Sequence, residues 1–243
     1  MKDFSWLSRT EALIQKEKVE LLAKQHVLVV GMGGVGSYAA EFLVRAGIGS
    51  LTIVDGDNVD PTNRNRQLPA MKSTEGKLKT EVMQARLLDI NPDLNLTIIT
   101  KFLNPEDTAQ IVNNEYDYIA DCIDSITPKL NLITGALKAG KRIVSSMGAG
   151  GRLDPTKIQV ADISKTYNCR LAFTIRKRLK DMGVRKGFKA VFSSELPLEG
   201  SLLYTNGLDY KKSAYGTISY LPAAFGGACA SVIVRDLIEF KIK

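Results

Sequence analysis

A glycine-rich turn near the N-terminus is the first feature of this sequence that could bind a ligand. Residues 27–30 form an apolar run typical of a buried strand, and the turn that follows contains Gly31, Gly33, Gly34 and Gly36. Glycines let the backbone approach a phosphate, and the next helix offers free N–H groups and the positive end of its dipole. The turn therefore predicts a nucleotide site, which could be for a dinucleotide or for ATP.

Polar residues beyond the turn favour ATP. Asp55 ends the second apolar run, roughly 20 residues after the glycines, where a carboxylate meets ribose hydroxyls. A dinucleotide has little use for several extra cations, whereas a triphosphate that loses pyrophosphate needs them, because charge builds on the leaving oxygens. The further candidate residues for this ATP site are Asp57, Asn63, Arg66, Gln67 and Lys79.

Asp124 is a candidate metal ligand just past the fourth apolar run. In a parallel sheet this position lies at the carboxyl edge, where ligands bind, and a carboxylate there can hold Mg²⁺ against phosphates. Two structural interpretations compete with these roles. Asp124 could cap a helix beginning at Thr127, and Lys79 could be a solvated residue near the start of its helix.

The elements that must position these residues alternate between strand and helix. This alternation predicts a Rossmann-like, doubly wound α/β fold with a mainly parallel sheet covered on both faces. On the third expected helix, Leu78, Val82, Ala85 and Leu88 form the expected core face, with Lys79 on a neighbouring face. The expected strands are residues 26–30, 50–55, 94–102, 116–123 and 142–147, and the expected helices are 8–24, 35–47, 75–90, 106–114 and 127–140.

The regular alternation of strands and helices ends after Gly151. We expect an exposed strand at 157–163, a basic helix at 168–182, a short strand at 189–192, a loop-like segment at 195–209 and a final buried or interface helix. In that last helix Ala224, Ala228 and Ser231 would allow another helix to approach closely. We interpret residues 1–243 as one adenylation domain, with an ATP-binding half at 1–150 and a substrate and dimer half, closed by the final helix, at 151–243.

The charge of the chain favours a polyanionic partner. The formal net charge is +7, and residues 165–189 carry many cations against the single acid Asp181. A basic run of this density can neutralise RNA phosphates, although it could also be a solvated helix face. Tyr167, Phe173 and Phe188 could stack on a base, or each could belong to the core. The candidate RNA-binding residues are Lys165, Arg170, Arg176, Lys177, Arg178, Lys180, Arg185, Lys186 and Lys189.

The cysteines and the apolar segments indicate a cytoplasmic protein. Cys122, Cys169 and Cys229 are too few and too scattered for a disulfide framework or for zinc bound by paired CxxC motifs, so we expect no zinc. The N-terminal residues lack the apolar core of a signal peptide. Residues 217–238 are interrupted by proline, glycine and charged residues, so we expect no transmembrane segment.

Taken together, these residues resemble the ubiquitin-activating-enzyme-like adenylyltransferases, the superfamily of ThiF, MoeB and HesA. The resemblance implies ATP and Mg²⁺ as cofactors, catalytic roles for Arg66, Lys79 and Asp124, and Asp124 as the aspartate that holds Mg²⁺ through the phosphates. It also implies a homodimer, because Arg9 in the Ser8-Arg9-Thr10 segment matches an arginine that reaches into the partner subunit's site.

Within this superfamily the whole chain is most similar to the dehydratases that act on N6-threonylcarbamoyladenosine beside the anticodon of tRNA. The similar segments are residues 4–10, 123–129, 148–155, 158–166, 171–179 and 191–195. The resemblance implies that the threonyl carboxylate is adenylated and that the ureido group then closes onto it, with AMP as the leaving group. The partner is therefore tRNA carrying this nucleoside, and a sulfur-relay or accessory protein is kept as a further candidate.

Two other functions stay open at this point. One is an adenylyltransferase for a sulfur-carrier or ubiquitin-like protein with a diglycine tail, against which the missing CxxC motifs and the basic segment weigh. A thiol-transfer step would need a cysteine such as Cys169, which we interpret instead as a partly buried structural residue. The other is an NAD-binding oxidoreductase. It leaves Arg66 and Lys79 unexplained, and the single histidine, His26, begins a core strand.

Overall fold

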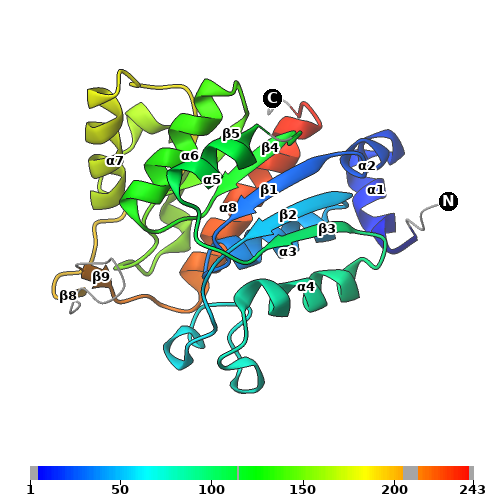
Figure 1. Ribbon diagram of the computed structural model, residues 1–243, viewed down its shortest axis with the longest axis horizontal. Helices are drawn as coiled ribbons and strands as arrows, with labels where there is room; N and C mark the ends of the chain where they lie inside the picture. The colour runs from blue at the N-terminus through cyan, green and yellow to red at the C-terminus, as the bar shows by residue number, and fades with distance from the viewer. Residues whose placement is uncertain (1–4, 114, 205–212, 241–243) are drawn as a thin grey trace.

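A seven-stranded sheet forms the centre of the molecule (Figure 1). The computed structural model describes residues 5–113, 115–204 and 213–240. The strand order is β3-β2-β1-β4-β5-β7-β6, and every neighbouring pair is parallel except β7 and β6. The strands are β1 (His26–Val30), β2 (Ser50–Val54), β3 (Asn95–Ile99), β4 (Tyr118–Asp121), β5 (Ile143–Ser146), β6 (Ile158–Asp162) and β7 (Lys189–Ser193).

Helices cover both faces of this sheet, which confirms the doubly wound α/β fold (Figure 1). One apolar core lies under α3 (Gly36–Arg45), α4 (Lys79–Ile90) and α8 (Tyr220–Leu237). The other lies under α5 (Pro105–Val112), α6 (Ile126–Lys138) and α7 (Arg170–Asp181). The strand order reverses between β1 and β4, and open sheets of this type bind ligands at that switch point, beyond the carboxyl ends of the strands.

The N-terminal segment forms two helices, where the sequence predicts one. They are α1 (Ser8–Ile14) and α2 (Lys16–Leu22), separated by Gln15, whose φ is 73°. This left-handed backbone conformation breaks the helical hydrogen-bond pattern between them. The end of α2 lies at the amino edge of the sheet, because the N–H of Ser50 donates to the carbonyl of Gln25.

Helix α8 is buried against α3, as expected, but through a different residue. A Cβ atom on Gly226 would lie 2.6 Å from the carbonyl oxygen of Val35, so only glycine permits this approach. The small residues that the sequence analysis selected for helix packing are not fully buried. Ala224 and Ala228 are half-buried, and Ser231 is exposed.

The segment before α8 contains a hairpin that the sequence analysis interpreted as loop. Its strands are β8 (Leu202–Tyr204) and β9 (Ser213–Tyr215), and residues 205–209 of the expected loop lie outside the described residues. Short 3-10 helices complete the fold: η1 (Ser5–Leu7), η2 (Pro61–Asn63), η3 (Lys72–Thr74), η4 (Pro155–Lys157) and η5 (Ile163–Lys165). Within the described ranges, no helix has both the length and the apolar character to cross a bilayer.

Candidate active site

The glycine turn lies between the ends of β1 and β4 and the start of α8, and Gly31, Gly34 and Gly36 have no space for a side chain. Gly31 has a φ of 95°, and a Cβ atom there would lie 2.8 Å from the carbonyl oxygen of Cys122. A Cβ atom on Gly34 would lie 2.9 Å from that of Pro222. Helix α3 begins at Gly36, so its free N–H groups and positive dipole end are at the carboxyl edge of the sheet.

Asp55 ties the turn to the end of β2. Its carboxylate accepts the N–H of Met32, inside the glycine turn, at 2.6 Å, and the N–H of Asp57 at 2.7 Å. Burial raises the pKa of the Asp55 carboxyl, while the nearby Lys79 ammonium opposes that shift. A half-buried carboxylate in this position has remaining lone pairs for ribose hydroxyls, as the sequence predicts.

Lys79 is a buried residue at the first position of α4, not a residue beside the core face. Its side chain is 5% exposed, and its Nζ lies 2.8 Å from Oδ2 of Asp57. The helix begins at Lys79 and not at Glu75, so the buried face continues through Met83 and Leu87. The expected core face is therefore wrong: Ala85 is exposed, and Leu78, Val82 and Leu88 are only half-buried.

The segment around η2 holds the other candidate phosphate ligands. Asn63 is buried, and its carbonyl accepts the N–H groups of both Arg66 and Gln67. The Arg66 Nη1 donates to the Thr62 carbonyl at 3.0 Å and to the Asn65 Oδ1 at 2.8 Å. These bonds use one nitrogen, so the guanidinium keeps donors for an anion.

Gln67 contains an unsatisfied polar atom at this site. Its Oε1 is buried, and among the described residues it has no hydrogen-bond partner. The side chain runs beside the glycine turn, because a Cβ atom on Gly33 would lie 3.8 Å from its Nε2. An orphaned buried acceptor costs about 1–3 kcal/mol. This atom fits a ligand that donates a hydrogen bond next to the phosphate-binding turn.

Asp124 lies in the turn after β4. An ion pair at the end of that strand stabilises the turn. The carboxylate of Asp121 accepts the N–H of Ile123 at 3.1 Å, and Lys129 Nζ lies 2.6 Å from its other oxygen. Asp124 is exposed at the carboxyl edge. Ser125, one residue after Asp124, occupies the N-cap position of α6. The sequence analysis did not identify the buried pair of Asp121 and Lys129.

Comparison with known proteins agrees with this geometry. Residues 7–242 match the ThiF family. The chain belongs to the ThiF family. The tRNA threonylcarbamoyladenosine dehydratase of Bacillus subtilis is 44% identical over 191 residues, which is 79% of this chain and 75% of that protein. The enzyme of the same name from Haemophilus influenzae is 38% identical over 239 residues, covering 94% of this chain and 92% of that one.

A solved structure gives the same family assignment. The Escherichia coli tRNA N6-threonylcarbamoyladenosine dehydratase in complex with ATP superposes with a TM-score of 0.89 at 37% sequence identity. The match covers 97% of this chain and 95% of that one. The expected similarity to the threonylcarbamoyladenosine dehydratases of this superfamily is therefore confirmed over nearly the whole chain.

His26 lies at the far end of β1 from the glycine turn of this ThiF-family chain. It is the first residue of the strand, and its Nε2 is 2.9 Å from the Thr52 hydroxyl. Burial lowers the pKa of His26, although Asp117 opposes that shift. The histidine is therefore a structural residue at the amino edge, where it cannot serve an oxidoreductase site at the carboxyl edge.

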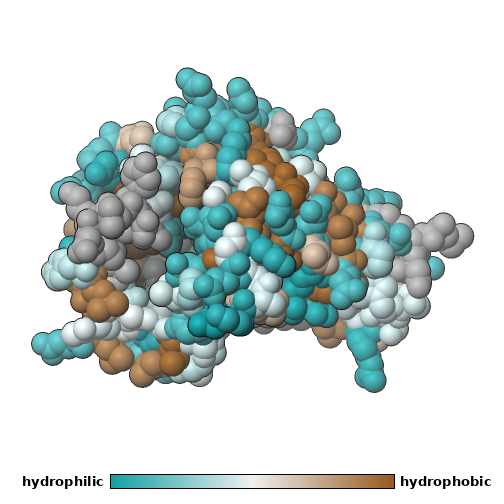
Figure 2. Space-filling view, turned by 60° about the horizontal axis from the view of Figure 1, so that its bottom comes forward, coloured by the Kyte–Doolittle hydropathy of each residue, from teal (hydrophilic) through white to brown (hydrophobic). Residues whose placement is uncertain are grey.

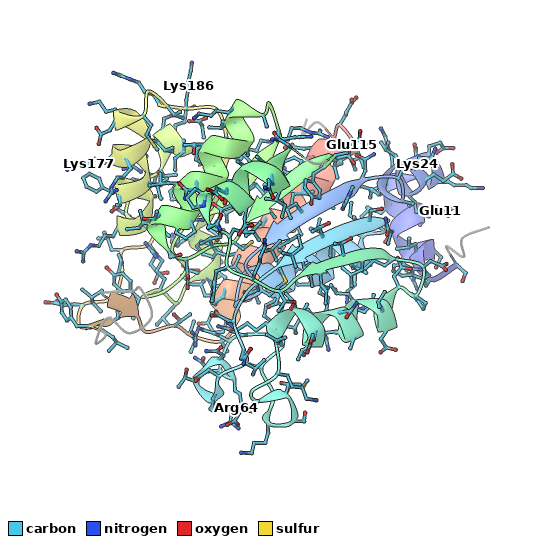
Figure 3. The ribbon with its side chains drawn as sticks, viewed as in Figure 1. Glu11, Lys24, Arg64, Glu115, Lys177 and Lys186 are labelled. Atoms are coloured by element: carbon cyan, nitrogen blue, oxygen red, sulfur yellow. The ribbon has the colours of Figure 1, made fainter. Side chains whose placement is uncertain are left out.

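Most of the candidate RNA-binding residues are exposed, whereas Arg176 and Lys189 bind other side chains. Lys177 on α7 and Lys186 in the loop after it point outward from the fold (Figure 3). Arg176 donates to the Thr166 hydroxyl, and Lys189 Nζ is 2.6 Å from Asp236 at the amino end of β7. The remaining candidate RNA-binding residues are exposed: Lys165, Arg170, Arg178, Lys180 and Arg185.

The three candidate aromatic residues near α7 differ in exposure: two are exposed and one is buried. Phe173 is 60% exposed on α7, one helical turn from both Arg170 and Lys177. Tyr167 is half-exposed and packs edge-to-face against Phe192. Phe188 is buried in the core, which is the alternative to stacking on a base.

Arg9 and Cys169 complete the predicted residues. Arg9 is exposed on α1, which lies at a different end of the molecule from the loop that carries Arg64 and Arg66 (Figure 3, where Glu11 marks α1). Leu7, just before α1, contacts Gly47 after the end of α3, whereas the glycine turn precedes the start of α3. Cys169 is buried at the N-cap position of α7, where its Sγ accepts the N–H of Ala172 at 3.5 Å.

Proposed function

We propose that this chain dehydrates N6-threonylcarbamoyladenosine in tRNA to its cyclic form, beside the anticodon and at the expense of ATP. The substrate assignment rests on the B. subtilis and H. influenzae dehydratases and on the ATP-bound E. coli dehydratase. The observation that carries the chemistry is the buried Lys79 beside Asp57 at the carboxyl edge of the sheet. A buried cation in that position suits a triphosphate whose leaving oxygens gain charge.

ATP would bind between the glycine turn and the η2 segment. The N–H groups at the start of α3 contact phosphates, Asp55 accepts from ribose, and the Gln67 Oε1 accepts a donor of the nucleotide. Arg66 and Lys79, with Asn63 beside them, neutralise the β- and γ-phosphates. The contacts that support this are the unpaired Gln67 acceptor and the tie between Asp55 and the glycine turn.

Asp124 would hold Mg²⁺ together with phosphate oxygens. Its carboxylate is exposed on the turn after β4, next to the glycine turn, since the N–H of Cys122 donates to the Val30 carbonyl. Within the described part of the chain, no group of three or more candidate ligand side chains surrounds a metal position. The ion would therefore need the nucleotide for most of its ligands, as Mg²⁺ commonly does.

The reaction has two steps that balance without another reactant. A carboxylate oxygen of the threonyl group attacks the α-phosphorus, and the bond to pyrophosphate breaks. The ureido group then attacks the activated carbonyl carbon, loses a proton, and displaces AMP, which keeps one former carboxylate oxygen. The nucleoside thus loses the elements of water. Ring closure is intramolecular, so correct positioning removes much of its barrier.

A homodimer would complete the site by adding Arg9 of a second copy. Arg9 is exposed on α1, and Leu7, two residues before it, contacts Gly47 at the end of α3 opposite the glycine turn, so its role in ATP binding would be in the site of a second copy. Phe42 on α3 is 39% exposed beside the half-buried Gly227 of α8. Figure 2 shows apolar surface in a band across the middle of the face turned forward. We infer that a second copy covers part of this surface, and that the enzyme works in the cytoplasm.

Exchange of labelled pyrophosphate into ATP tests the first step. We expect exchange only when tRNA carrying N6-threonylcarbamoyladenosine is present, because its carboxylate is the acceptor of the adenylyl group. Unmodified tRNA is the matched control. Exchange supported by a diglycine-tailed carrier protein and not by the modified tRNA would instead favour the carrier-protein adenylyltransferase.

A further inference from the structure

Arg152 is a buried arginine that binds four backbone carbonyls at once. Its side chain is 3% exposed. Its Nε donates to the Glu195 carbonyl at 2.9 Å, and its Nη1 donates to the carbonyls of Gly148 at 2.8 Å and Gly150 at 3.0 Å. Its Nη2 donates to the Asn168 carbonyl at 2.6 Å. Such a planar set of donors is specific to arginine.

Glu195 also binds the segment that contains Arg152, through its own side chain. Its carboxylate accepts the N–H of Leu153 at 3.1 Å and that of Asp154 at 2.9 Å. The segments 148–155 and 191–195, which the sequence analysis selected without giving them a role, therefore interlock. We call the Arg152 and Glu195 contacts together the clasp.

The clasp joins the nucleotide edge of the sheet to the basic helix. Gly148 and Gly150 follow β5, the neighbour of β4, and Glu195 follows β7. Asn168 immediately precedes the N-cap residue of α7, and its own Nδ2 donates to the Ser194 carbonyl at 2.7 Å. The start of α7 is thus fixed by hydrogen bonds to two loops at the carboxyl edge.

A second set of contacts continues from the clasp to the candidate phosphate ligands. The N–H of Gly151 donates to the Gly216 carbonyl at 2.8 Å. The next carbonyl, that of Thr217, accepts from Asn65 at 2.9 Å, and Asn65 also binds Arg66. The hydrogen-bonded path therefore runs from the start of α7 to the guanidinium of Arg66.

We propose that Arg152 is a positioning residue that fixes the start of α7 relative to the nucleotide site. The proposal rests on the proposed function. RNA bound to the exposed cations of α7 must bring one carboxylate to the α-phosphate, and a displacement of about 1 Å can reduce a rate by about 100-fold. The clasp holds that separation constant, and in the described part of the chain the hydrogen bonds of Arg152 go to Gly148, Gly150, Asn168 and Glu195 rather than to the candidate ATP ligands.

Two variants and one matched control test this role. Arg152→Lys keeps the charge but cannot bind four carbonyls, and Arg152→Gln removes the charge. Arg142→Gln is the control, because the Arg142 guanidinium also donates to backbone carbonyls, those of Asp117 and Asp236, but at the amino edge. Each protein is assayed for ATP affinity, for kcat and KM with modified tRNA, and for amide hydrogen exchange in α7.

We expect both Arg152 variants to bind ATP within about twofold of the parent and to lose about 10- to 100-fold in kcat/KM for tRNA. Exchange in the first turn of α7 rises about tenfold, while β1 and β2 keep their protection. Arg142→Gln leaves all these values near those of the parent. Unchanged α7 exchange, or an equal loss of ATP affinity and tRNA turnover, would overturn the proposal. If the parent fails to dehydrate the tRNA, the proposed function fails, and the exchange measurement still decides whether Arg152 fixes α7.

Discussion

Lys129 Nζ lies 2.6 Å from Oδ2 of Asp121, and neither side chain is exposed. The Ser145 hydroxyl on β5 donates to the same carboxylate oxygen at 2.5 Å, while Lys129 donates to the hydroxyl oxygen at 3.1 Å. The second carboxylate oxygen accepts the N–H of Ile123. This buried ion pair therefore joins β4, β5 and α6 beneath the turn that presents Asp124.

Lys129→Met should destabilise the fold, because it leaves the Asp121 carboxylate buried without its cation. The expected loss is about 3–5 kcal/mol of unfolding free energy. Chemical denaturation measures it, and the double variant Asp121→Asn, Lys129→Met should recover part of the loss. A loss below about 1 kcal/mol in the single variant would contradict a stabilising role for this pair.

Arg66→Ala and Asp124→Ala should each abolish turnover with the fold intact. Each removes a charge that stabilises the leaving pyrophosphate, directly or through Mg²⁺, and a loss of about 100-fold or more is expected. Pyrophosphate release measures the rate, and circular dichroism checks the fold. The control is Arg64→Ala, since Arg64 is exposed and donates only to the Pro61 carbonyl among the described residues. Unchanged pyrophosphate release in either variant rules out the site assignment.

Gln67→Leu should change protein stability and ATP affinity in opposite directions. It removes the orphaned Oε1, so the protein without nucleotide gains about 1 kcal/mol. It also removes an acceptor for the nucleotide, so ATP affinity falls about tenfold. Thermal unfolding and calorimetric titration measure the two effects. A destabilised variant with unchanged ATP affinity would show that Gln67 serves only the fold.

Lys177→Ala should weaken tRNA binding more than Lys189→Ala does. Lys177 is exposed on α7, whereas Lys189 is paired with Asp236 at the amino edge. A lysine that contacts phosphate contributes about one unit to the salt dependence of binding. Filter binding at several salt concentrations compares the two variants. Equal losses would show that the RNA surface extends around the amino end of β7.

The strands nearest the site could be predicted from the sequence because their signal is local. The expected strand at 26–30 is found as His26–Val30, since a continuous apolar run is typical of a strand buried on both faces. The expected order of strand and helix is also confirmed up to β5. In these parallel βα units the site residues follow strand ends, so their common edge could be predicted as well.

Features that depend on tertiary contacts could not be predicted in the same way. Lys79 is buried because α4 begins at that residue, after Gly76 with a φ of 78°, and helix starts are poorly determined by periodicity. The helical pattern at residues 8–24 did not indicate the break at Gln15. The roles of Arg152 and Lys129 rest on partners in other elements, Glu195 after β7 and Asp121 on β4, and residue spacing alone does not show these contacts.

Mass spectrometry of the tRNA nucleosides distinguishes a dehydratase from a protein that only binds ATP. Transfer RNA that carries N6-threonylcarbamoyladenosine is incubated with this protein, ATP and Mg²⁺, then digested to nucleosides. We predict that the modified nucleoside loses the mass of one water, only when ATP is present, and that AMP forms in equal amount. A nucleoside that keeps its mass while the protein binds ATP would contradict the dehydratase function.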